Sequence, residues 1–126
     1  MAVPALAQSS FPDVRGTWKG ESESIINGTG NSHHPASPQD GPQLGSVTLT
    51  LTIDKQDGRR FSGTFSSARA TEKIVGVISR NGTLYYVDSD GYAFATLLSS
   101  NRLESCYLQI TSNGQVASCT EMTKQQ

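Results

Sequence analysis

Two adjacent histidines are the residues of this sequence whose type points most directly to chemistry. His33 and His34 lie in the segment "SHHPASPQD", and they are the only histidines in the 126 residues. Imidazoles ligate metals and act as general bases, but a metal site needs a third ligand, and Asp40 is the only carboxylate nearby in the sequence. We therefore predict a solvent-exposed polar loop, with a metal or general-base role of the histidines as the alternative, and we expect no metal and no cofactor.

Hydroxyl and aromatic side chains form the second candidate set. If the strands alternate as described below, eight of these residues would face inward as possible ligand-binding residues: Trp18, Ser22, Ser24, Phe65, Tyr86, Tyr92, Phe94 and Tyr107. Apolar bodies with a few convergent hydroxyls are typical of a small-molecule site. The alternative is that these side chains simply fill the interior. In "TLYYVD" apolar residues occupy both faces, so Tyr85 and Tyr86 can exchange roles.

The remaining motifs that resemble sites are predicted to be turns. Asp88 and Asp90 in "VDSDGY" look like a fragment of a calcium loop, but the twelve-residue length and the terminal Glu are missing. The "NGT" triplets at 27–29 and 81–83 are also predicted to be turns. The sequence has neither a Gly-rich phosphate loop nor a Gly-x-Ser-x-Gly elbow. We therefore assign no enzyme activity, and keep a barrel enzyme that uses the tyrosines or histidines as a third option.

Two-residue alternation is the main structural pattern of the chain. In "SVTLTLTID" the apolar Val47, Leu49, Leu51 and Ile53 share one face, and serine and threonines share the other, which is typical of a half-buried antiparallel strand. Turn sequences rich in Asn, Asp, Gly and Ser separate the runs at regular spacing. The pattern predicts eight strands, at about 14–25, 46–54, 60–66, 73–80, 83–88, 91–99, 103–111 and 115–123.

Short connections between eight consecutive strands predict an all-β fold, an eight-stranded up-and-down antiparallel β-barrel. A meander of twisted strands removes its unpaired edges by closing into a barrel. The exception is the segment 26–45, rich in Gly, Pro, Ser and Asn, which we expect to be a long loop at one mouth. We expect a single barrel domain over 9–126 and a remnant of a secretory signal, or a flexible terminus, over 1–8.

Trp18, in "VRGTWKGES", is the only tryptophan and is flanked by Gly16 and Gly20. Alternation places it on the inner face of the first strand. We expect the indole to fill the closed end of the barrel, because the flanking glycines leave it room and let the strand bend.

A Gly-x-Trp motif on a first strand resembles the calycin superfamily, which includes lipocalins, fatty-acid-binding proteins and avidins. "GTWKGESES" followed by "DGRRFSGTFSSA" is similar to the avidin arrangement, which would place Ser24 and Ser67 where avidins carry hydroxyls that bind biotin. Gly20 stands where avidins have an asparagine and Phe65 where they have a tyrosine. The resemblance therefore implies a ligand-holding barrel, and tight biotin binding is not expected.

The last strands resemble a second calycin group, the bacterial periplasmic metalloprotease inhibitors. The similarity lies in "DSDGYAFATLLSSNRLESCYLQITSNGQV". Those inhibitors thread an amino-terminal arm into a protease, whereas the arm here, residues 8–13, is short, and the cysteines are placed differently. A protease inhibitor or other protein-binding barrel is the alternative function.

Cysteines and composition bear on location and partners. Cys106 and Cys119 flank the turn "SNG", so we predict a disulfide between neighbouring strands, with two unrelated thiols as the alternative. Ala5-Leu6-Ala7 resembles the end of a secretory signal. A net charge of −1 and the lack of an apolar run of roughly 20 residues argue against nucleic-acid and membrane partners.

These observations together predict an exported protein, periplasmic or secreted, that holds a small, partly apolar molecule in a β-barrel. Strands with apolar residues on both faces leave room for a homo-oligomer, because one outer wall would then be covered.

Overall fold

The structure, a computed structural model, describes residues 10–34 and 41–126. The predicted signal remnant at 1–8 and Asp40 lie outside the described residues. All of the elements in the described part are strands: β1 (Gly16–Gly28), β2 (Gln43–Gly45), β3 (Thr48–Asp57), β4 (Arg60–Ser66), β5 (Thr71–Ile78), β6 (Leu84–Val87), β7 (Tyr92–Ser99), β8 (Arg102–Thr111) and β9 (Gly114–Lys124). No helix among these residues is long and apolar enough to cross a membrane.

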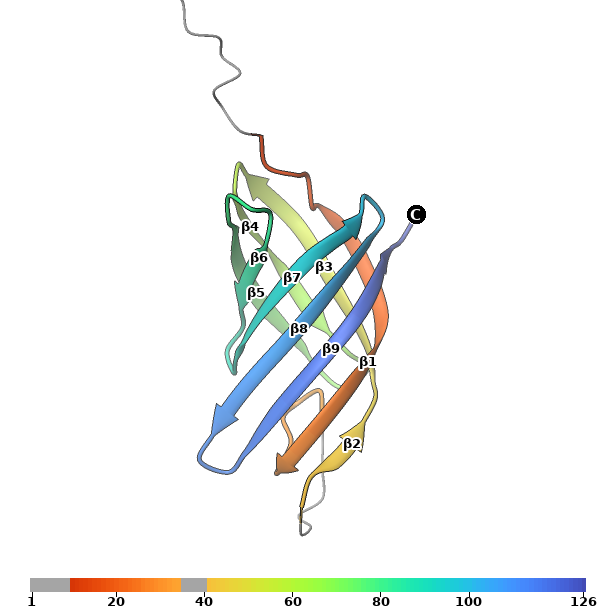
Figure 1. Ribbon diagram of the computed structural model, residues 1–126, viewed down its shortest axis with the longest axis vertical. Helices are drawn as coiled ribbons and strands as arrows, with labels where there is room; N and C mark the ends of the chain where they lie inside the picture. The colour runs from red at the N-terminus through yellow and green to blue at the C-terminus, as the bar shows by residue number, and fades with distance from the viewer. Residues whose placement is uncertain (1–9, 35–40) are drawn as a thin grey trace, which may run out of the picture.

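The strands form one closed antiparallel sheet. Their order is β2-β1-β3-β4-β5-β6-β7-β8-β9, and β1 also pairs with β9, from Trp18 opposite Lys124 to Gly28 opposite Gly114. This last pairing closes β1 and β3 to β9 into an eight-stranded up-and-down barrel, with the strands tilted around its axis (Figure 1). The predicted fold class is therefore confirmed.

The short strand β2 is the one element that the alternation did not predict. It lies within the segment 26–45 and pairs with Ser24 to Ile26 of β1, continuing the edge along which β3 pairs with Gly16 to Glu21. Three residues flanked by Gly and Pro are too few to show a two-residue period. Part of the predicted loop therefore extends the sheet.

Alternation fills the barrel from each of the eight strands that close it. On β3 the side chains of Leu49, Leu51 and Ile53 are at most 1% exposed, while the threonines between them face outward or lie at intermediate depth. A one-residue slip would turn this apolar row out into water, so burial determines the register.

Trp18 closes the barrel end at which β1 begins. Its side chain is 1% exposed, its Nε1–H donates to the carbonyl oxygen of Val14 at 3.0 Å, and the Lys124 ammonium lies 5.5 Å from the ring centroid. A Cβ at position 20 would lie 2.0 Å from the Glu121 carbonyl oxygen, so Gly20 lets the backbone of β9 approach β1 closely. The predicted role of the indole as the floor of the barrel agrees with this placement.

Two predicted inward positions are wrong. Tyr92 is 52% exposed and Phe94 is 38% exposed, and the residues of β7 that face inward are Ala93 and Ala95. In "YAFATLL" both alternating rows are apolar, so no polar residue marks the outer face. Packing decides instead: the interior accepts the small alanines opposite Tyr86 and Leu84, and the large rings lie outside.

We expect Trp18→Ala to lower the free energy of unfolding by about 3–5 kcal/mol, because it leaves a cavity at the floor of the barrel. The control Lys19→Ala removes the neighbouring exposed side chain and should change stability by less than about 0.5 kcal/mol. Urea unfolding followed by circular dichroism measures both. Equal effects of the two substitutions would contradict the assignment of the floor to Trp18.

Candidate functional site

The segment that follows β1 carries both histidines into the barrel mouth. In Figure 1 this segment curls back at the end of the barrel where β1 ends. His33 is 3% and His34 is 2% exposed, so the predicted solvent-exposed loop is wrong at these residues. Asn31 causes the turn, because its Oδ1 accepts the main-chain N–H groups of His33 at 2.9 Å and His34 at 2.7 Å.

His33 is held between two strands by both of its ring nitrogens. Its Nδ1 lies 2.6 Å from Ser67 Oγ, just after β4, and its Nε2 lies 3.2 Å from Glu72 Oε2 on β5. The other oxygen of that carboxyl, Oε1, accepts the hydroxyl of Ser89 at 2.9 Å. The ring also packs edge-on against Phe65, with centroids 5.4 Å apart. These contacts together fix the orientation of the His33 ring.

Burial sets the charge state of this group. It lowers the pKa of His33, an effect that the carboxylates of Asp88 and Asp90 partly oppose. Burial, followed by hydrogen bonding with Asp88, raises the pKa of Glu72 to about 7. Above pH 7 Glu72 is ionised and only accepts, so Nε2 of the neutral imidazole carries the proton. Nδ1 of His33 is then an acceptor for the Ser67 hydroxyl.

His34 differs from its neighbour in having no hydrogen-bond partner among the described residues. Both ring nitrogens are inaccessible to water and make no hydrogen bond to the described residues. Burial, and then the charge of His33, lowers the pKa of His34 to about 4, so its ring is neutral at pH 7. Each buried polar group left without a partner costs roughly 1–3 kcal/mol. A buried group of this kind calls for a partner beyond the described residues, such as a ligand or a buried water.

Hydroxyl groups cover part of the inner wall, as the alternation predicted. Ser24 Oγ donates to Ser22 Oγ at 3.2 Å or to Ser118 Oγ at 2.9 Å. Tyr86 hydrogen-bonds with Ser105, and burial raises the pKa of Tyr86. These hydroxyls face inward, but they satisfy one another.

Phe65 and Tyr107 link this wall to the histidines. Phe65 is 4% exposed and lies between His33 and Tyr86. The ring centroids of Phe65 and Tyr86 are 6.3 Å apart. Tyr107 is 7% exposed, and its hydroxyl lies 3.5 Å from Asp88 Oδ1, while burial raises its pKa. Among the predicted residues, the structure thus brings Phe65, Tyr86 and Tyr107 toward the histidine mouth. Trp18 lies at the opposite end, and Tyr92 and Phe94 lie outside.

Ser67 and Glu72 were not predicted as partners of His33. Glu72 shares the alternation phase of Ile74 and Ile78, both of which are buried. A carboxylate in the inward phase of a strand was therefore the available signal. Ser67 was singled out only through the avidin resemblance, and its contact with a residue 34 positions away could not be seen in the sequence.

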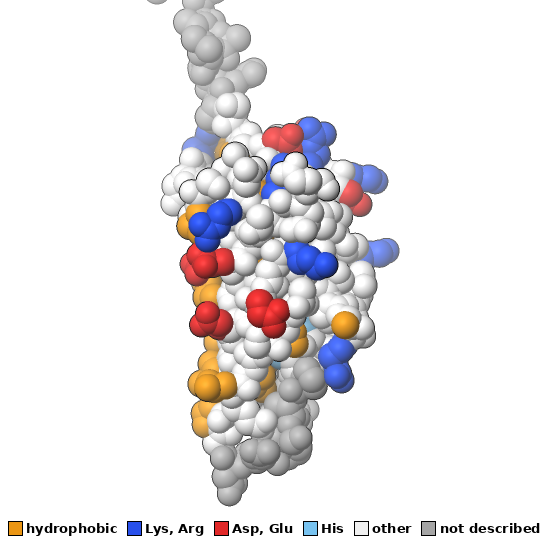
Figure 2. Space-filling view, turned by 90° about the vertical axis from the view of Figure 1, so that its right-hand side faces the viewer, with side chains coloured by type: hydrophobic (Ala, Val, Ile, Leu, Met, Phe, Trp, Pro, Cys, Tyr) orange, Lys and Arg blue, Asp and Glu red, His pale blue; other side chains and the backbone are white. Residues whose placement is uncertain are grey.

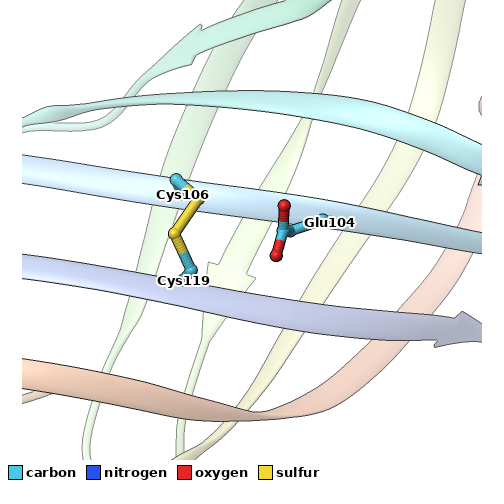
Figure 3. A group of neighbouring side chains, drawn as sticks. All are labelled: Glu104, Cys106 and Cys119. Atoms are coloured by element: carbon cyan, nitrogen blue, oxygen red, sulfur yellow. A yellow bond between two sulfur atoms is a disulfide. The ribbon is translucent and has the colours of Figure 1, made fainter.

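The predicted disulfide between Cys106 and Cys119 is confirmed. The two residues are direct cross-strand partners on β8 and β9, and their sulfurs are bonded (Figure 3). With Glu104 they form the one group of potential metal ligands found close together in the described part of the chain. Both thiols are oxidised, so this group cannot act as a thiolate metal site.

Cavities open on the outer wall of the barrel. One, of about 820 Å³, is lined mainly by apolar side chains of β5, β6 and β7, including Val75, Val77 and Tyr85. A cavity of about 620 Å³ includes Ile25 and Ile110, which are 46% and 74% exposed. Figure 2 shows hydrophobic side chains along one lower edge of the face turned to the viewer. The homo-oligomer expected from such strands stays a prediction.

The fold defines the class of this protein as a closed eight-stranded antiparallel β-barrel, an architecture that lipocalins and streptavidin share. No protein-family model and no curated protein matches the sequence. Among solved structures, the S-type phycobiliprotein lyase CPES from Guillardia theta is 13% identical, with a TM-score of 0.41, over 90% of this chain and 89% of that chain. A likeness of this degree carries no argument about function, so the proposals below rest on the site itself.

We expect His34→Leu to stabilise the ligand-free protein by about 1–3 kcal/mol at pH 7, because it removes the unpartnered polar atoms. Burial lowers the pKa of His34 from 6.5 to about 4. Below pH 6.5 the unfolded chain therefore takes up a proton at His34 before the folded protein does. The free energy of unfolding of the wild type falls for this reason as the pH drops from 6.5 to 4. The stability gap between variant and wild type should therefore widen by about 3 kcal/mol over that range. Urea unfolding at pH 7 and pH 4 measures it; a constant gap would contradict the burial of a neutral ring.

Proposed function

We propose that this protein binds a small, partly apolar molecule at the mouth of the barrel that the two histidines close. The observation that carries the proposal is the pair of unpartnered ring nitrogens of His34. A neutral imidazole offers one donor and one acceptor, so the ligand would supply one of each. The gain on binding is large, because the penalty of two unpaired polar atoms is removed.

The surroundings of the histidines support a ligand with an apolar body. Phe65, Ile26 and Val116 are buried on the inner wall, and Tyr107 adds a ring with a polar tip. We assign Phe65 and Tyr107 to the site, together with His34, and leave Trp18 as the floor.

Binding would require the segment 29–34 to shift, because the barrel interior is filled by side chains. Among the described residues, hydrogen bonds hold this segment to the wall: Thr29 N–H donates to the Asn113 carbonyl oxygen at 3.2 Å, and Asn31 Nδ2 donates to Gln109 Oε1 at 2.6 Å. The ring of His33 adds its contacts with Ser67 and Glu72. Breaking such net hydrogen bonds costs about 0.5–1.5 kcal/mol each, and pairing the two His34 nitrogens, worth about 1–3 kcal/mol each, would offset a cost of this size.

We also infer that the protein is exported. The disulfide supports this inference, since disulfides persist in oxidising compartments. The alternative of a protease inhibitor depends on the arm at residues 8–13, which lies partly outside the described residues, and it stays a prediction.

Native mass spectrometry of the protein purified from its own source tests the binding proposal. We expect a retained small molecule, which His34→Leu should lose by a factor of at least 10, since unpaired groups on the ligand cost about 1.4 kcal/mol or more. Tyr92→Leu is the matched control, because this ring lies outside the barrel, and it should retain the molecule. An empty wild-type protein whose His34 nitrogens bind only ordered water in a crystal structure would overturn the proposal.

Thiol titration tests the inferred compartment. Protein from its own source should show no free thiol before reduction and both cysteines after it, because Cys106 and Cys119 are bonded. Reduction should also lower the free energy of unfolding by about 2–4 kcal/mol. Detection of both thiols in the native protein would remove the support for export.

A further inference from the structure

Ser67, His33 and Glu72 form a continuous hydrogen-bonded chain across the barrel mouth. The hydroxyl of Ser67 lies 2.6 Å from one imidazole nitrogen, and the Glu72 carboxylate lies 3.2 Å from the other. The order is that of a nucleophile, a base, and an acid that orients the base. Because Ser89 also donates to Glu72, the carboxylate is fixed in turn.

Ser67 is placed between this buried chain and an open cavity. His33 is 3% exposed, whereas Ser67 has intermediate exposure and lines a cavity of about 630 Å³ on the outside of β1, β3 and β4. A molecule in this cavity can therefore reach Ser67 without entering the barrel. The base behind the hydroxyl stays shielded from water.

We propose that Ser67 is the nucleophile of a second, catalytic site, which hydrolyses small carboxylic esters bound in this outer cavity. The proposal goes beyond ligand binding at His34, which has no part in the chain from Ser67 to Glu72. The two proposals have separate readouts, because labelling of Ser67 is measured in ligand-free protein, in which the segment 29–34 is in place.

The charges of the cavity favour this substrate class. Lys19 and Arg69 line it, and the one carboxylate in its lining, that of Glu21, already accepts the hydroxyls of Ser46 and Thr48. The main-chain N–H of Arg69 donates to Ser67 Oγ at 3.2 Å and so helps to orient the hydroxyl. Cationic side chains beside a nucleophile stabilise the negative charge that develops on an ester carbonyl oxygen.

The reaction balances with water as the only co-substrate. Ser67 Oγ attacks the carbonyl carbon while its proton passes to His33 Nδ1; the bond to the alcohol oxygen then breaks, and that oxygen takes the proton. Water next attacks the acyl-serine, gives one proton to His33, and releases the carboxylic acid as the proton returns to Ser67 Oγ. No oxidant or reductant takes part.

The groups that face His33 suit its role as the base. They are the carboxyls of Glu72 on β5 and of Asp88 and Asp90 in the turn after β6, with the neutral ring of His34 beside it. Burial lowers the pKa of His33, so the free imidazole is neutral and able to take a proton. The nearby carboxylates then stabilise the imidazolium that forms.

Labelling of wild-type protein with a fluorophosphonate tests the nucleophile directly. We expect the probe to modify Ser67, located by peptide mass spectrometry, and we expect Ser67→Ala to abolish the label. Ser62→Ala is the matched control, because Ser62 lies on the same strand β4 but lines a different outer cavity, and it should be labelled like wild type. A wild-type protein that is unlabelled, or labelled elsewhere, would overturn the proposal, and this result does not depend on the folding of any variant.

Hydrolysis of p-nitrophenyl acetate tests the chain behind Ser67. We expect Ser67→Ala and His33→Ala to lower kcat/KM by at least about 100-fold, and Ser62→Ala to leave it unchanged. Glu72 is a positioning residue, so Glu72→Gln should lower kcat with KM unchanged. Its pKa is about 7, so Glu72→Gln should also remove a rise in kcat that the wild type shows as the pH passes 7. Hydrolysis by Ser67→Ala at the wild-type rate would refute the assignment.

Discussion

The pairing of β1 with β9 is the interaction on which the rest of this structure depends. It joins the first and last long strands, removes the edges that an open meander would expose, and so gives every strand an inside and an outside. Gly20 permits the close approach of the two backbones near the barrel floor. Without closure, neither the apolar row of β3 nor the buried histidines would have an interior to occupy.

The closed interior is divided between an apolar end and a polar end. Trp18, Leu51 and Ile53 exclude water at the first, while His33, Glu72, Tyr86 and Tyr107 gather at the second. Polar groups at that depth are tolerable only where they pair, and nearly all of them do. His34 is the exception, and the cost of leaving its ring unpaired is the kind of local instability that proteins keep at sites of binding. The same mouth therefore contains His33, whose two ring nitrogens are both hydrogen-bonded, and His34, whose two ring nitrogens have no partner among the described residues.

Prediction succeeded where one local pattern and burial agree. The threonines of β3 mark its outer face, so its inner residues were assigned correctly. The two cysteines lie on either side of a tight turn, which places them on neighbouring strands of one hairpin. It failed on β7, where rings and alanines alternate and both rows are apolar, because packing volume alone decides between Phe94 and Ala95. Polarity also misled the assignment of His33, since a polar loop is ordinarily exposed.

The sequence by itself determined the eight long strands, the inner face of strands in which apolar and polar residues alternate, the indole at the floor and the disulfide, because each follows from neighbours within one strand or one hairpin. Only the tertiary structure decided which residues form a site. Ser67, His33 and Glu72 come from two strand ends and a loop, separated by 34 and 39 positions, and they meet only after the barrel closes. The partner of a buried side chain is a property of three-dimensional packing, and a single sequence carries no local pattern that records it.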